Sequence, residues 1–171
     1  MKNKLIISAS GPDRNGIVSE ISSIINNYNA NIETSRMIRL GEQFTTLILI
    51  HIDLKHIDNL KFDLQNIKNL NIDTILTKSS EKQTSNYFQL FINGADNEGI
   101  VYAFSKYFEE KSVNIEEINT SIENAPMSAS PLFMMHLIIS SNDNLTKDKT
   151  FIDSLNKIAD RLGVGVDLDK N

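Results

Sequence analysis

An internal repeat is the feature that most constrains how this chain can fold. Residues 11–18 read GPDRNGIV and residues 94–101 read GADNEGIV, 83 positions later. The same offset places Asn31-Ile-Glu33 on Asn114-Ile-Glu116. From Phe44 onward the apolar run aligns best with Phe133, 89 positions later, so the second copy has about six more residues, within residues 123–131. The chain is therefore two copies of one structural unit.

Both copies predict the same order of secondary-structure elements. In the first copy we expect strands at residues 5–10, 31–40, 44–52 and 71–76, with amphipathic helices at 16–28 and after Ile57. In the second copy we expect strands at residues 87–93, 113–122, 132–140 and 164–168, and a last helix that ends at Gly163. The order βαββαβ predicts an α+β fold of two tandem ferredoxin-like domains. Each would have an antiparallel sheet with both helices on one face.

The domain limits follow from the repeat and from one polar segment. Residues 79–86 contain no large apolar side chain, as is typical of a linker. We expect a first domain at residues 1–78, a linker at 79–86 and a second domain at 87–171.

Composition excludes several classes of function. The 171 residues include no cysteine, which excludes disulfides, thiol nucleophiles and cysteine-based metal sites. The net charge of -5 argues against a nucleic-acid partner, because such proteins usually present a basic patch. The short apolar run after Met1 is far below a signal sequence or a membrane span, so we expect a cytoplasmic protein with no membrane contact.

The repeated turn allows two interpretations. Asp13 and Asp96 could cap backbone N–H groups at the start of the following helix, while Gly16 and Gly99 could permit close backbone approach. A capped strand-to-helix turn of this kind also occurs in proteins that bind no ligand there. The turn alone therefore leaves a binding role and a purely structural role open.

Three motifs follow one another along the chain: the turn at residues 11–18, Asn-Ala-Asn-Ile-Glu at 29–33, and Ala-Pro-Met-Ser-Ala-Ser-Pro-Leu-Phe at 125–133. In the order and spacing of these motifs, the chain resembles the ACT domain family of amino-acid-sensing modules. The resemblance covers nearly the whole chain and is strongest to two-module members that regulate transcription. It implies a repressor-like regulatory protein that binds a small amino acid, with glycine as one candidate. Such a protein would act on a transcription factor through protein contacts and would form a homodimer.

The resemblance also implies where the effector binds. In ACT domains the site lies where the turn after the first strand meets the start of the second strand, often between modules. A helix N-terminus suits a carboxylate, and Asp or Asn oxygens suit an ammonium group. The residues that correspond in this chain are Asp13, Asn15, Gly16, Ile17 and Asn31 in the first copy, and Asp96, Gly99, Ile100 and Asn114 in the second.

The two turns differ in charge. Where the first copy has Arg14-Asn15, the second has Asn97-Glu98, so a cation is lost and an anion is gained. Because an extra anion weakens attraction for a carboxylate, we expect the first copy to be the better ligand site and the second to serve mainly for packing.

Other functions have weaker support. His51, His56 and His136 show no metal-ligand spacing, so we expect strand or edge histidines, no metal and no cofactor. No catalytic motif is recognisable, and we expect no enzyme activity. An RNA-binding sheet would carry exposed aromatic side chains with basic neighbours, whereas the extended segments here offer Arg36 and Arg39 in one copy and Glu116, Glu117 and Glu123 in the other. The main alternative is a ligand-free ACT module with a structural or interaction role.

Overall fold

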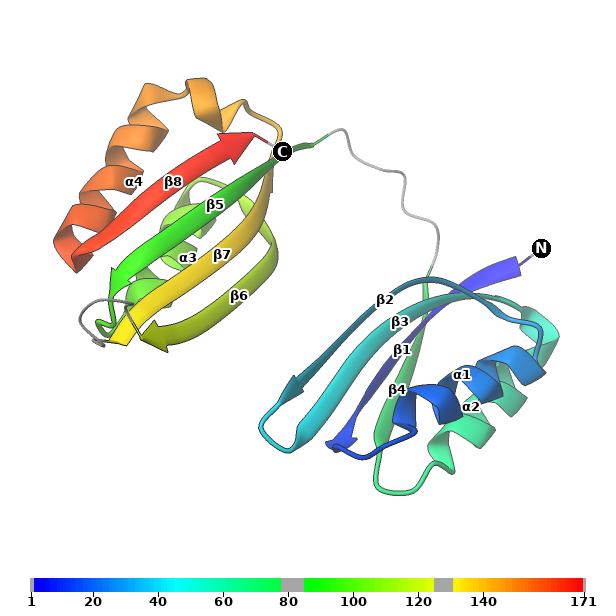
Figure 1. Cartoon of the computed structure of the whole chain (residues 1–171). Helices are drawn as coiled ribbons and strands as arrows, with labels where there is room; N and C mark the ends of the chain where they lie inside the picture. Colours follow the sequence, from blue (N-terminus) through cyan, green and yellow to red (C-terminus); the bar gives the residue numbers. More distant parts are fainter. Residues whose placement is uncertain (1, 78–84, 125–130, 171) are drawn as a thin grey trace. The chain divides into compact units, whose positions relative to one another are not determined.

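The computed structural model describes residues 2–77, 85–124 and 131–170. The chain divides into two compact units, Met1–Glu81 and Lys82–Asn171. Each unit has a four-stranded antiparallel sheet with two α-helices on one face (Figure 1). The predicted fold of two βαββαβ domains is therefore confirmed.

In the first unit the strand order across the sheet is β2-β3-β1-β4. The central strands β1 and β3 pair along their whole length, and β2 lies at the edge. The elements are β1 Lys2–Pro12, α1 Ile17–Asn27, β2 Asn31–Leu40, β3 Gln43–Asp53, the short 3₁₀ helix η1 Leu54–His56, α2 Ile57–Gln65 and β4 Asn71–Thr77.

The second unit repeats this topology with the order β6-β7-β5-β8. Its edge strand β6 corresponds to β2, and its central strand β5 corresponds to β1. The elements are β5 Asn86–Ala95, α3 Ile100–Glu110, β6 Asn114–Asn124, β7 Pro131–Ser141, η2 Leu145–Lys147, α4 Lys149–Leu162 and β8 Val164–Lys170.

The strand registers reproduce both sequence offsets. Asn31 is opposite His51 in the first sheet, and Asn114 is opposite Ser140 in the second, which keeps the offsets of 83 and 89. Both edge strands also have a bulge at the same place, just after Ile32 and just after Ile115. Most of the insertion, including Met127, and most of the predicted linker at 79–86 lie outside the described residues. The domain limits therefore stay a prediction.

Each unit has its own hydrophobic core, and the two cores differ in side-chain type. In the first unit α1 buries Ile17, Ile21 and Ile25 against the sheet, at the predicted helical spacing. In the second unit four phenylalanines fill the core with at most 2% of their surface exposed: Phe88, Phe104, Phe108 and Phe151. Burial of this apolar area is the main stabilising contribution in both units. No helix among the described residues combines the length and apolar character needed to cross a membrane.

Gly16 and Gly99, which recur in both copies of the repeat, do not have the role predicted for them. Gly16 and Gly99 have φ angles of 92° and 84°, and nothing lies within 4 Å of where a side chain would begin. Their role is the left-handed conformation before each helix, so the prediction of close backbone approach at these positions was wrong. The close approach occurs at Gly11, where a Cβ would lie 2.3 Å from the Asn69 carbonyl oxygen, and at Gly94, 2.7 Å from the Gly163 oxygen.

We predict that Gly11→Ala lowers the free energy of unfolding of the first unit by about 1–3 kcal/mol, because the added methyl group must displace backbone. Ser19→Ala on the exposed side of α1 is the control, with a change within about 0.5 kcal/mol. Urea unfolding of both variants measures the difference. Equal stabilities would contradict the close approach.

Candidate functional site

The turn after β1 is fixed to the hairpin between β2 and β3. The Asp13 N–H donates a hydrogen bond of 2.8 Å to the Glu42 carbonyl oxygen. The Asp13 carboxylate forms an ion pair of 3.2 Å with Nε of Arg39, which also donates to the Gly41 oxygen. Sequence reasoning did not identify Arg39 and Glu42 as neighbours of the turn.

The predicted capping role of the two aspartates was wrong. The residue that precedes α1 is Gly16 and the one that precedes α3 is Gly99, and neither helix start has a side-chain cap. In each helix the first intrahelical bond is accepted by that glycine, from Glu20 N–H in α1 and from Ala103 N–H in α3. The earlier N–H groups of both helices are left without a capping side chain, an arrangement that suits an anionic group.

The structure does not bring Asn31 to the turn. Asn31 is opposite His51, which is opposite Lys4 near the beginning of β1, whereas the turn follows Pro12 at the other end of that strand. Eight residues of extended strand separate the two levels by roughly 26 Å. Asn114 and the second turn are at opposite ends of their sheet in the same way. Within one unit, Asn31 and Asn114 therefore do not lie beside the turns, and a site that joins them between modules stays a prediction.

The remaining predicted residues divide between core and surface. Ile17 and Ile100 are each 2% exposed and face the core, so only their backbone can contact a ligand. Asn15 and Asp96 are exposed. Asn114 donates 2.8 Å to the Glu116 carboxylate at the far end of its sheet.

The charges around the two turns differ as the sequence indicates. In the first unit, Arg14 forms an ion pair with Glu20, and both side chains are about 40% exposed. In the second unit the corresponding residue is Asn97, whose side-chain amide donates 2.9 Å to the Leu162 carbonyl oxygen at the end of α4. This bond fixes the second turn to the end of α4.

A cavity of about 180 Å³ lies between α1 and the β2–β3 hairpin of the first unit. Its apolar lining residues are Val18, Ile21, Ile32, Met37, Phe44 and Ile48. Its polar lining residues are Ser22, Ser35 and Thr46. Because Val18 is in the first turn of α1, the cavity begins close to the uncapped helix start. Sequence reasoning did not predict this cavity.

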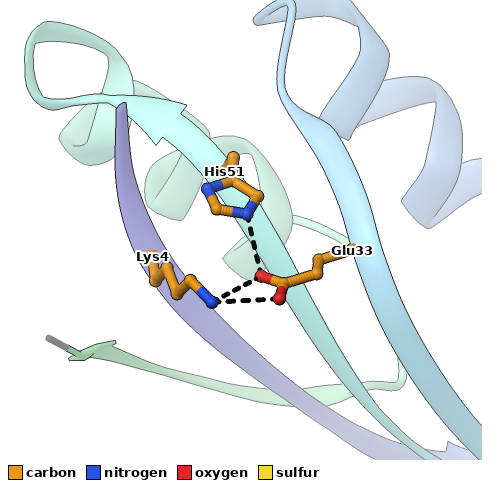
Figure 2. A network of polar contacts seen from close by, with 3 residues as sticks. All are labelled: Lys4, Glu33 and His51. Carbon is orange, nitrogen blue, oxygen red and sulfur yellow. Dashed lines mark hydrogen bonds and ion pairs between the residues drawn. The ribbon is translucent and has the colours of Figure 1, made fainter. Parts of the chain in front are cut away.

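A charged cluster lies at the opposite end of the first sheet, where β2 bulges (Figure 2). The Glu33 carboxylate contacts Nζ of Lys4 at 2.8 Å and Nε2 of His51 at 2.8 Å. The hydrogen bond from Lys4 is the main cause that lowers the pKa of Glu33. The equivalent Glu116 accepts a hydrogen bond of 2.6 Å from the Ser140 hydroxyl, and this bond lowers the pKa of Glu116.

The three histidines lie in different surroundings. His51 belongs to the Glu33 cluster, His56 lies against the Tyr28 ring at 5.8 Å, and His136 stacks on Phe91 at 4.4 Å. Within residues 2–77, 85–124 and 131–170, no group of three or more His, Asp or Glu side chains is placed to hold a metal ion.

Comparisons with known proteins agree with this fold. Residues 3–75 match the ACT domain family. A relative from Escherichia coli K12, named glycine cleavage system transcriptional repressor, is 25% identical over 154 residues, which are 87% of this chain and 80% of that protein. A relative with the same name from Shigella flexneri gives the same values. Both relatives are named as repressors of transcription.

Two crystal structures are similar over the whole chain. An unknown protein from Galdieria sulphuraria has a TM-score of 0.88 and 27% identity, covering 100% of this chain and 99% of that one. A candidate glycine cleavage system transcriptional repressor has a TM-score of 0.68 and 22% identity, with the same coverage, and shows the shared fold.

We predict that Glu33→Gln lowers the Tm of the first unit more at neutral pH than at about pH 3. A carboxyl group whose pKa is lowered by folding stabilises the protein above its unfolded pKa of about 4.3, and this contribution is lost as pH falls through the folded pKa. Thermal melts at both pH values, with exposed Glu42→Gln as control, measure the effect. The same Tm difference at both pH values would contradict the role of the ionised carboxylate.

Proposed function

We propose, from the match of residues 3–75 to the ACT domain family, that the chain is an amino-acid-responsive regulatory protein. It would bind a free amino acid as its small effector and act by protein contact on a regulator of transcription, as a glycine cleavage system transcriptional repressor-like protein. The support is the similarity to the repressor over 87% of the chain, together with the turn geometry of the first unit.

The uncapped start of α1 carries this proposal. Its free backbone N–H groups can bind the carboxylate of an amino acid. The Asp13 carboxylate is 29% exposed, and it can bind an ammonium group that takes the place of the Arg39 side chain. Because the Asp13–Arg39 pair is close to the surface, its contribution is small enough for a ligand to replace it.

We propose the first turn as the principal site and the second as a packing element. The second turn has Glu98 where the first has Asn15, and Asn97 is already bonded to Leu162. An added anion and a fixed amide both reduce the attraction for a zwitterion.

We also propose that Asn31 contributes to a site on a second copy. Strand β2 is an edge strand whose residues are exposed except for half-buried Ser35, so it is free to pair with another chain. In a two-fold antiparallel pair of β2 strands, the Asn31 end of one copy lies beside the Leu40 end of the other. The Leu40 end of β2 lies level with the Asp13 turn of the same copy. A homodimer would therefore bring Asn31 of one copy close to the Asp13 turn of the other.

A protein partner fits the charge better than DNA does. The chain has a net charge of -5, whereas binding to a phosphate backbone is driven by basic residues. We therefore propose contact with a transcription factor rather than with its operator, from a protein located in the cytoplasm.

A ligand-free ACT module is the alternative, and one observation favours it. Asp13 and Arg14 are both already in ion pairs, with Arg39 and with Glu20, so the charged side chains of the turn have partners without a ligand. A thermal-shift screen against the twenty amino acids separates the two functions, because a ligand that binds only the folded state raises the Tm. The absence of a shift at millimolar concentrations would support the alternative.

We predict that Asp13→Ala weakens amino-acid binding by about 10-fold or more, because it removes a charged hydrogen-bond acceptor. The matched variant Asp96→Ala should bind as the unsubstituted chain does. Isothermal titration calorimetry of both variants measures the difference. Loss of binding in Asp96→Ala alone would show that the second unit is the sensor.

A further inference from the structure

The cavity beside α1 has an apolar floor and an apolar rim. The floor residues Phe44 and Ile48 on β3 are 7% and 5% exposed, and Thr46 between them is 2% exposed. The rim residues Val18 and Met37 are 43% and 49% exposed. Apolar side chains that line both the floor and the rim favour a ligand that removes them from water.

The polar groups of the cavity do not favour a charged ligand. No charged side chain is among the lining residues. The hydroxyl of Thr46, the buried polar residue of the floor, already donates 2.9 Å to the Arg36 carbonyl oxygen. A charged group in the cavity would lose its hydration without gaining an ionic partner.

The size of the cavity fits a large apolar side chain. Its volume is about 180 Å³. Apolar cavities of about 150 Å³ in other proteins bind benzene. The side chains of leucine, isoleucine, methionine and phenylalanine are therefore of suitable size, whereas glycine has no side chain to place there.

At three of the corresponding positions the second unit has a larger side chain, whereas Met37 is replaced there by the smaller Thr120. Ser35 corresponds to Ile118 and Thr46 to Met135 by the offsets that the strand registers confirm, and Ile21 corresponds to Phe104 by the sequence offset of 83. Phe104 is fully buried and Met135 is 2% exposed, so their side chains occupy interior space. The smaller side chains Ser35 and Thr46 thus belong to the first unit, which also has the cation Arg14 in its turn.

We infer that this cavity is the side-chain subsite of the effector and that it selects free amino acids with an aliphatic, thioether or phenyl side chain over glycine. The inference rests on the proposed function, since the head group of the same amino acid would lie at the start of α1. Val18 is two residues beyond Gly16, a rise of about 3 Å along the helix, so one ligand can reach both places.

Calorimetry with leucine and glycine on the full chain tests the selectivity. Each buried methylene group contributes about a fourfold gain in affinity, so leucine should bind at least about 30-fold more tightly than glycine. Phenylalanine, methionine and isoleucine should group with leucine, and aspartate and lysine should group with glycine or bind more weakly.

Two variants that fill the cavity test its location. Ser35→Ile gives β2 the side chain of the second unit, and Ser22→Leu fills the cavity independently from α1. Each should weaken leucine binding by about 10-fold or more while changing glycine binding by less than about twofold, because the head-group contacts are unchanged. Ile118→Ser in the second unit is the matched control and should leave leucine binding as it was. Circular dichroism melts show whether each variant folds. If one of them does not fold, the other variant provides the test.

The outcomes separate the inference from the function on which it rests. If no amino acid binds, the proposed function and this inference both fail. If glycine binds as tightly as leucine, and the filling variants leave leucine binding unchanged, the effector function stands and the cavity inference is overturned. A change of oligomeric state in Ser35→Ile without a change in selectivity would assign the cavity to a second copy and would likewise overturn the inference.

Discussion

The pairing of β1 on both of its edges is the constraint on which the first unit depends. Strand β1 is bonded to β3 on one side and to β4 on the other, and its Leu5 and Ile7 are fully buried. Because β1 and β2 are both antiparallel to β3, they run in the same direction, and α1 must cross over between them. This single fact places the turn after β1 beside the end of β2. It also produces the Asp13–Arg39 pair and separates Asn31 from the turn.

The duplication preserved this framework and changed the chemistry attached to it. Both units keep a glycine with positive φ before the first helix, a close-approach glycine in the central strand and a bulged edge strand. The two units differ in the side chains of the turn before the first helix and in the core side chains that pack next to the edge strand. The first unit has Arg14 and a cavity floored by Thr46, and the second has an anchored Asn97 and a buried Met135. The shared features are those that the fold requires, whereas the differences are what a division between sensing and packing would produce.

The sequence predicted the fold well because repetition and periodicity are carried by many residues. Strand β2 was predicted at its observed limits, and Gly163 ends α4 in the left-handed conformation as expected. The site was predicted less well because a motif shows which residues are near in sequence, not which strand ends are near in space. The right-handed crossover of a βαβ unit could have identified Arg39 and Glu42 as neighbours of Asp13. The cavity depends on the relative sizes of Ser35, Thr46 and the side chains around them. No local sequence pattern predicts such a cavity.

The central claim is that the first unit senses an amino acid and the second does not. Amide chemical-shift mapping by NMR during a titration of the full chain with leucine tests it most directly, because every backbone N–H reports on its own surroundings. We expect the largest shifts at Gly16, Ile17 and Val18 and along β2, with the equivalent residues 99–101 and β6 unchanged. Shifts confined to the second unit would contradict the account.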